Sequence, residues 1–251
     1  MTRPRRTPRK LAALLGTAAL AAVLGLGLVG CEATDVDVYV PTRVTVEHAD
    51  GSPAETVAYT LDEHGNAVGV TTDQGQAHSE QTTSFDPYGV PTESAGVAVD
   101  TDLELDDRGQ PTRIAVTTPL DGGEVVYTYY DVRGRIETAS ITRQDGSSRT
   151  VRYDRDGWPL ESVSTDSAGN VQEESYVYEI NENGAVTKMI VSAEGFDPAE
   201  FTYTYDGNGC IATQTLPDGT VVSYEYELVK NPSPLAMANA LLRIPFPGTR
   251  L

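Results

Sequence analysis

The sequence Tyr153-Asp154-Arg155-Asp156-Gly157 is one copy of a phrase that recurs along the chain: an apolar or aromatic residue, Asp or Asn, two variable residues and Gly. The other copies begin at Leu61, Phe85, Leu105, Tyr130, Ile180 and Tyr205 and end at Gly65, Gly89, Gly109, Gly134, Gly184 and Gly209. With Gly157 included, successive glycines lie 20 to 27 residues apart, with a mean of 24. This spacing indicates an array of repeats.

The residue types in the phrase are those of a tight turn. An Asp or Asn side chain accepts a hydrogen bond from the backbone two residues further on, and Gly supplies a positive φ without steric cost. A second turn signal, such as Asp145-Gly146 or Asp218-Gly219, lies roughly midway between neighbouring phrases, and Asp-Gly between alternating segments marks a hairpin. Each period therefore predicts two strands and two turns.

The segments between the turns alternate as strands do. Tyr176-Val177-Tyr178, Tyr203-Thr204-Tyr205 and Tyr224-Glu225-Tyr226 place two tyrosines on one face, where they would form cross-strand ladders. We predict an all-β fold, an extended and twisted antiparallel meander of about a dozen strands, with a β-propeller as the alternative. Ser233-Pro234 can begin a short helix over 235–242. This tail would be a cap over the open edge of the last strand.

The N-terminal residues have the features of an export signal. Five basic residues precede a largely apolar run from Leu11 to Leu28, and Leu28-Val29-Gly30-Cys31 follows at once. This resembles the lipobox of bacterial lipoproteins, which implies lipidation of Cys31; a transmembrane anchor is the alternative. We predict a signal peptide over 1–30, a lipidated cysteine and tether over 31–35, a repeat domain over 36–226 and a cap over 227–251.

Charge and cysteine content restrict the partners. Loss of residues 1–30 would change the formal charge from −19 to −24. Such a charge repels nucleic acid, so no nucleic-acid partner is expected. If Cys31 carries a lipid, Cys210 is the only remaining thiol and no intramolecular disulfide is expected. Cys210 is then interpreted as an incidental residue at a variable repeat position.

With the phrases and the Tyr-x-Tyr strands in view, the chain resembles the YD-repeat (RHS-repeat) family. The most similar copies begin at Tyr130, Tyr153 and Tyr205, and the resemblance covers about 57–226. In large members the repeats form a spiralling β-sheet shell that encloses a toxin or other cargo. Seven repeats are too few to enclose cargo, so the resemblance implies the coiled antiparallel sheet without encapsulation.

Three phrases offer Asp or Asn at alternating positions before Gly, as the opening of a calcium-binding EF-hand loop does. The candidate metal ligands are Asp154, Asp156, Asn181, Asn183, Asp206 and Asn208. No copy has the closing Glu at fixed spacing, so turn formation is the preferred interpretation. No cofactor is expected, with calcium as the alternative.

Other chemistry is sparse. Trp158, the only tryptophan, is a candidate carbohydrate contact, although a ring that covers apolar surface is the commoner role. We find no Gly-x-Ser-x-Gly elbow, and the three histidines lie far from Cys210 in sequence. Asp154 and Asp156 could act in glycoside hydrolysis only with a defined separation and a cleft. No catalytic residue is assigned, and the protein is predicted not to be an enzyme.

Together these features predict a lipoprotein of the bacterial cell envelope, anchored in the membrane by its N-terminal lipid. Its repeats would act as an extracytoplasmic binding or scaffold module for carbohydrate, such as a polysaccharide, or for a surface protein. A calcium-stabilised adhesion module and a glycan-active hydrolase are the alternatives.

Overall fold

The computed structural model describes residues 9–10, 31–32, 37–107, 111–117, 123–129 and 135–240, and in these it contains twenty strands and one helix. The first strands are β1 (Arg9–Lys10), β2 (Cys31–Glu32), β3 (Asp37–Glu47), β4 (Glu55–Leu61), β5 (Ala67–Gln74), β6 (Ala77–Phe85), β7 (Pro91–Ser94), β8 (Val97–Ala98), β9 (Asp100–Leu105) and β10 (Pro111–Thr117). The others are β11 (Glu124–Tyr129), β12 (Ile136–Thr142), β13 (Ser148–Tyr153), β14 (Pro159–Thr165), β15 (Val171–Ile180), β16 (Val186–Ala193), β17 (Phe196–Asp197), β18 (Ala199–Tyr205), β19 (Ile211–Thr215) and β20 (Val221–Lys230), followed by α1 (Pro234–Ala240). The predicted all-β class is confirmed.

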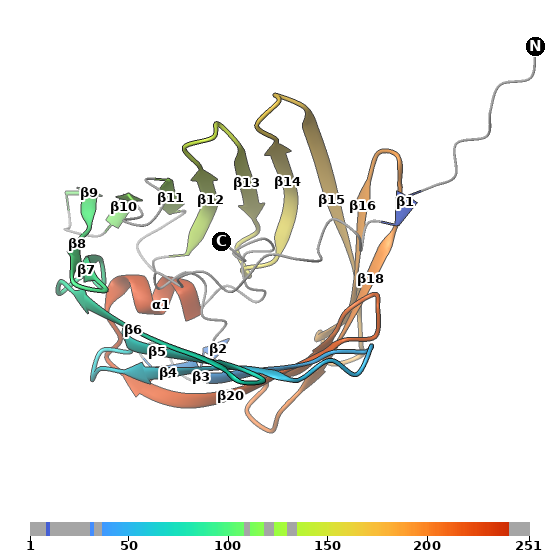
Figure 1. The fold of residues 1–251 in the computed structure, drawn as a ribbon, viewed down its shortest axis with the longest axis horizontal. Coiled ribbons are helices and arrows are strands. Elements are labelled where there is room, and N and C mark those ends of the chain that lie inside the picture. The colour runs from blue at the N-terminus through green and yellow to red at the C-terminus, as the bar shows by residue number, and fades with distance from the viewer. Residues whose placement is uncertain are drawn as a thin grey trace, which may run out of the picture.

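The strands follow one another around a barrel-shaped sheet (Figure 1). Successive strands pair antiparallel from β3 to β8 and from β9 to β20, with β16 joined to β18, and the last long strand β20 returns to the first long strand β3. That seam runs from Val221 opposite Glu47 to Lys230 opposite Asp37. The short strand β2 joins this sheet by pairing with β3, whereas β1 and β17 form a separate two-stranded parallel sheet.

The turns of the recurring phrase share one geometry in all five described copies. The Oδ1 atom of the Asp or Asn accepts the N–H groups two and four residues further on at 2.8–3.0 Å. The Gly of each copy has φ between +77° and +82°, a backbone conformation that favours glycine. We call these loops the anchor turns: 62–66, 86–90, 154–158, 181–185 and 206–210. Gly109 and Gly134, predicted to close further copies, lie outside the described residues.

The nearly closed, barrel-shaped sheet corrects the prediction of an open meander of about a dozen strands. The register shifts of this sheet occur beside the anchor turns or at the same end of a neighbouring strand. A β-bulge bends its strand and adds to the right-handed twist. Because the bulges repeat on the same rim, we infer that the bends accumulate in one direction until the last long strand β20 meets the first long strand β3.

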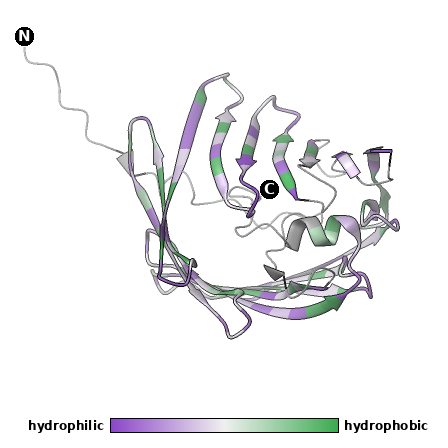
Figure 2. Ribbon diagram, turned by 180° about the vertical axis from the view of Figure 1, so that it is seen from behind, coloured by the Kyte–Doolittle hydropathy of each residue, from purple (hydrophilic) through white to green (hydrophobic). Residues whose placement is uncertain are grey.

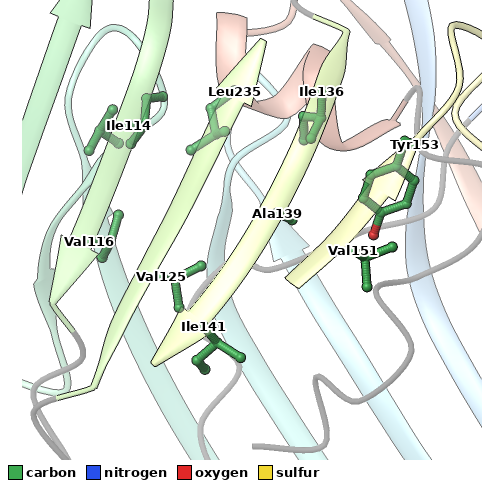
Figure 3. Close-up of a cluster of buried hydrophobic side chains, with 10 residues drawn as sticks. Ile114, Val116, Val125, Ile136, Ala139, Ile141, Val151, Tyr153 and Leu235 are labelled. Atoms are coloured by element: carbon green, nitrogen blue, oxygen red, sulfur yellow. The ribbon is translucent and has the colours of Figure 1, made fainter. Parts of the chain in front are cut away.

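The helix α1 lies inside the ring of strands rather than over an edge, which corrects the predicted cap. There α1 packs against two buried clusters of apolar side chains rather than along the edge of a strand. Leu235 packs into a buried cluster formed mainly by β10–β13, which includes Ile114, Ile136 and Tyr153 (Figure 3). Met237 packs against a second cluster with Val38 and Val40 of β3.

The start of α1 is held by the first two anchor turns. The Ser233 Oγ atom accepts the Ala236 N–H at 3.2 Å, so Ser233 is the N-cap and Pro234 the first helical residue, as the sequence predicted. The Ser233 N–H donates to the carbonyl of His64, and the Leu235 N–H donates to that of Tyr88. Within the described residues, no helix has the length and apolar character needed to cross a membrane.

Candidate functional site

The side of the sheet that faces α1, the inner face, carries most of the buried side chains. Along several of the longer strands apolar and polar residues alternate, as the bands of Figure 2 show. On this face, residues that are paired on successive strands form a row across β12–β15. The row consists of Ala139, Val151, Ser162 and Glu174. The candidate site is the part of this face on β13–β20, where aromatic and charged side chains meet.

Three inner-face tyrosines share a contact that links adjacent strands. The hydroxyl groups of Tyr178, Tyr205 and Tyr226 each donate to a backbone carbonyl of the preceding strand. The acceptors are Pro159, Val186 (2.7 Å) and Ile211 (2.9 Å). Each acceptor stands two residues after the Gly of an anchor turn, at the register shift, where the strand ladder is disrupted. We call these three contacts the tyrosine ties.

Burial perturbs the ionisation of these rings. It is the main cause that raises the pKa of Tyr178, Tyr203, Tyr224 and Tyr226 above the usual value. Burial also raises the pKa of Tyr176 and of Tyr59 to about 12. The neutral phenol is therefore the form that this face stabilises at physiological pH.

Trp158 lies within this aromatic surface. Its ring centroid is 5.2 Å from that of Tyr178 and 6.1 Å from that of Tyr203. The ring is half-buried against the apolar cluster of β15–β19. This position matches a ring that covers apolar surface. A sugar ring would have to contact the part of the Trp158 ring that stays exposed.

A charged cluster lies beside the aromatic rings. Three donors converge on the Oε2 atom of Glu174: Arg149 Nη2 at 2.7 Å, Ser162 Oγ at 2.7 Å and the Tyr176 hydroxyl at 3.0 Å. Ser162 is 1% exposed, and the side chains of Arg149 and Glu174 are 16% and 13% exposed. The Nε atom of Arg149 is buried without a hydrogen-bond partner. Because donors from β13, β14 and β15 converge on one carboxylate oxygen, the cluster is suited to fixing the register of these three strands.

Sequence reasoning missed this cluster. Arg149 and Glu174 lie on strands separated by β14, which brings them together only after both hairpins have formed. Their separation is about one repeat period, and no local spacing rule signals such a contact. The alternation of each strand does place both on the inner face, which was the one available signal.

The residues proposed as metal ligands take part in the anchor turns. The Oδ1 atoms of Asp154, Asn181 and Asp206 accept the paired backbone N–H groups described above. Asp156, Asn183 and Asn208 each supply one of those N–H groups. The three turns are successive repeats along the chain, and no group of three or more His, Cys, Asp or Glu residues suited to a metal occurs among the described residues.

Cys210 differs from its expected state. It is 1% exposed, at the end of an anchor turn, and it is disulfide-bonded. The expectation of an incidental free thiol is therefore wrong. The side chain of Cys31, the other cysteine of the sequence, lies outside the described part of the chain, as do residues 11–30.

Comparison with known proteins gives partial similarities. No family model matches the chain. Double-stranded DNA deaminase toxin A of Burkholderia cenocepacia (strain H111) is 30% identical over 135 residues, and the match covers 45% of this chain and 9% of the toxin. The chain thus corresponds to a small fraction of that protein.

Comparison with solved structures gives matches of low TM-score and low identity. A porin-like protein from Bacteroides uniformis has a TM-score of 0.40 and 13% identity, covering 74% of this chain and 96% of its own. The TcdB2-TccC3-Cdc42 structure has a TM-score of 0.38 and 10% identity, covering 80% and 12%. The Photorhabdus luminescens Tc holotoxin pore has a TM-score of 0.37 and 13% identity, covering 73% and 10%. None of these similarities assigns this chain to a family or an activity.

Proposed function

We propose that this protein is a lipid-anchored scaffold of the bacterial cell envelope, whose YD-type repeats form a rigid extracytoplasmic module that binds carbohydrate or a surface protein. The observation that carries the proposal is the short distance in sequence between the lipobox cysteine and the first long strand of the sheet. The first long strand β3 begins at Asp37, shortly after the lipobox cysteine Cys31, and pairs with the last long strand β20. A lipid on Cys31 would hold the barrel close to the membrane surface.

The site favours binding over catalysis. In the charged cluster, the serine–carboxylate pair Ser162 and Glu174 is hydrogen-bonded to Arg149 and Tyr176 rather than to a histidine. The similarity to the deaminase toxin does not change this proposal. Zinc deaminases use a Cys-x-x-Cys motif, whereas this sequence has two cysteines, at 31 and 210. Its charge of −19 also opposes the approach of DNA.

The anchor is tested by fatty-acid labelling in a bacterial host. The protein is expressed with a clickable palmitate analogue, and the label and membrane fractionation are measured for the native chain, Cys31→Ala and Cys210→Ala. We expect the label in the native chain and in Cys210→Ala, and its loss in Cys31→Ala. Because the sequence has two cysteines, a disulfide of Cys210 within the chain and a thioether at Cys31 exclude each other, and the labelling decides between them. An unlabelled native protein with a Cys31–Cys210 disulfide would therefore contradict the anchor.

The binding role is tested by thermal melting of the purified protein with a panel of polysaccharides. A ligand that binds only the folded state at a hundredfold excess over Kd adds about 2.7 kcal/mol to the free energy of unfolding. We expect a shift with envelope polysaccharide that is reduced in Trp158→Ala. If no polysaccharide shifts the melting temperature, the carbohydrate role is wrong and the surface-protein role stands to be tested by pull-down. The same melt with calcium and with a chelator tests the calcium alternative.

A further inference from the structure

Among the described residues, the sequence of paired strands is interrupted at one place, on the side of β9 that faces away from β10. β6 pairs with β5 through residues 77–82, and with β7 only through residues 83–85. β9 pairs with β10, and the opposite side of β9 has no pairing within the described residues. The short strands β7 and β8, which pair with each other, lie between β6 and β9 (Figure 1). β9 therefore presents an open edge.

The hydrogen bonds around β9 indicate which groups face this edge. The Val99 N–H donates to the carbonyl of Thr92 on β7, so the backbone of Val99 points away from β10. Backbone groups alternate in direction along an antiparallel strand. By this alternation the N–H and C=O groups of Thr101, Leu103 and Leu105 point to the open edge. An open edge of this kind is a template for another strand.

The two faces of β9 have different chemistry. Asp100, Asp102 and Glu104 lie on the outer face, where Arg113 is the basic side chain in reach of the last two, at 2.9 and 3.3 Å. The inner face carries Leu103, which packs against the buried cluster, and Leu105, which is 41% exposed. An added strand would thus meet carboxylates on one face and apolar side chains on the other.

We propose that the open edge of β9 binds an extended peptide segment of a partner protein in which basic and apolar residues alternate. Basic side chains of the segment would lie beside Asp100, Asp102 and Glu104, and apolar side chains beside Leu103 and Leu105. Strand addition supplies main-chain hydrogen bonds, and alternate side chains supply specificity. A second copy of this chain fits poorly, because its β9 would bring the same carboxylates against one another and its net charge is −19.

The experiment uses the full chain and a fluorescein-labelled peptide with Lys and Val in alternation. Binding is measured by fluorescence anisotropy at low and at raised salt. The controls are the same peptide with Glu in place of Lys, and the Lys peptide with Pro at its central Val. We expect binding of the Lys-Val peptide that weakens with salt, and at least tenfold weaker binding of both control peptides.

The matched protein variant is Thr101→Pro, which removes one edge-facing N–H. Proline is tolerated at an edge position whose N–H does not enter the ladder, and circular dichroism verifies the fold. We expect at least a tenfold loss of peptide affinity, together with slowed amide exchange at Leu103 when the peptide binds the native chain. Absence of binding, equal binding by Thr101→Pro, or unprotected β9 amides would overturn the proposal. Sedimentation as a β9-linked dimer without peptide would overturn it too.

Discussion

The tyrosine ties explain why the second tyrosine of each Tyr-x-Tyr segment suits this fold. A register shift disturbs the ladder beside each anchor turn, and the carbonyl there needs a donor. The hydroxyl groups of Tyr178, Tyr205 and Tyr226 supply one from the adjacent strand. One side chain thus fills the inner face and satisfies the backbone of the neighbouring repeat.

Removal of one tie is predicted to destabilise the barrel. In Tyr205→Phe the ring stays and the carbonyl of Val186 loses its donor, which costs about 1–2 kcal/mol. Chemical denaturation measures this cost. The control is Tyr39→Phe, because the half-buried Tyr39 forms no hydroxyl contact in the described structure. Equal stabilities of the two variants would show that the ties contribute nothing.

The charged cluster makes a second prediction at this scale. Glu174→Gln keeps the shape of the side chain but leaves Arg149 without its counter-charge, which costs roughly 3 kcal/mol for a buried pair. Combination with Arg149→Met should recover much of this loss. Glu161→Gln is the control, because its ion pair with Arg152 is exposed, and it should change the free energy of unfolding little. A similar loss in both single variants would contradict the cluster's role.

At the scale of elements, the anchor turns and α1 depend on each other. An added Cβ at Gly89 would lie 2.2 Å from Ser233 Oγ and 2.7 Å from Asn66 Oδ1. The backbone of Gly89 therefore leaves room for the helix N-cap as well as adopting a φ of +80°. At Gly184 the same φ occurs with nothing within 4 Å.

This contrast predicts different effects for the same substitution. Gly184→Ala should cost about 1–2 kcal/mol, because Ala is forced into a left-handed conformation. Gly89→Ala should cost a further 1–3 kcal/mol, roughly the cost of overpacking, because it displaces Ser233. Addition of Ser233→Ala to Gly89→Ala should restore part of this further loss of stability, because it removes the hydroxyl group that the new methyl group would displace. If denaturation gives equal losses at Gly89 and Gly184, α1 is not held by the turn at Gly89.

The sequence predicts the elements well because their determinants are local. Asp or Asn followed by Gly fixes an anchor turn, and Ser233-Pro234 fixes the helix start. The position of α1 was not predictable, because it depends on contacts between Ser233 and Asn66 that are far apart in sequence. The Arg149–Glu174 pair was missed for the same reason. Closure depends on the sum of many small bends, which no single repeat reveals.

At the scale of the whole molecule, the buried tyrosines make the fold sensitive to alkaline pH. An unfolded tyrosine ionises near pH 10, whereas burial raises the pKa of Tyr59 and Tyr176 to about 12 and raises those of Tyr178, Tyr203 and Tyr226 further. The folded state then keeps protons that the unfolded state releases. This stability is complete below pH 10 and is lost as the pH rises through the folded values.

We therefore predict that unfolding and tyrosinate formation occur together above pH 10. A pH titration followed by ultraviolet absorbance of tyrosinate and by far-ultraviolet circular dichroism measures both. Tyrosinate formation near the ordinary pKa, with the circular dichroism of the barrel unchanged, would mean that the inner face is open to solvent.

The seam between β3 and β20 is what makes the repeats a barrel. Thr45 on β3 stands opposite Ser223 on β20, and opposite residues on antiparallel strands have Cα atoms roughly 4.5–5.5 Å apart, within the range for a disulfide. Thr150, exposed on β13, lies far around the circuit from both. A cross-link between positions 45 and 223, without one between 45 and 150, therefore distinguishes a sheet whose first and last long strands meet from an open sheet.

The most direct measurement is oxidative cross-linking of the Thr45→Cys, Ser223→Cys double variant, with the bond located by peptide mass mapping. We predict an intramolecular 45–223 disulfide in high yield, and none between positions 45 and 150 in the control Thr45→Cys, Thr150→Cys. If the thiols at 45 and 223 stay reduced, or link only between molecules, the first and last strands do not meet and the sheet is an open meander.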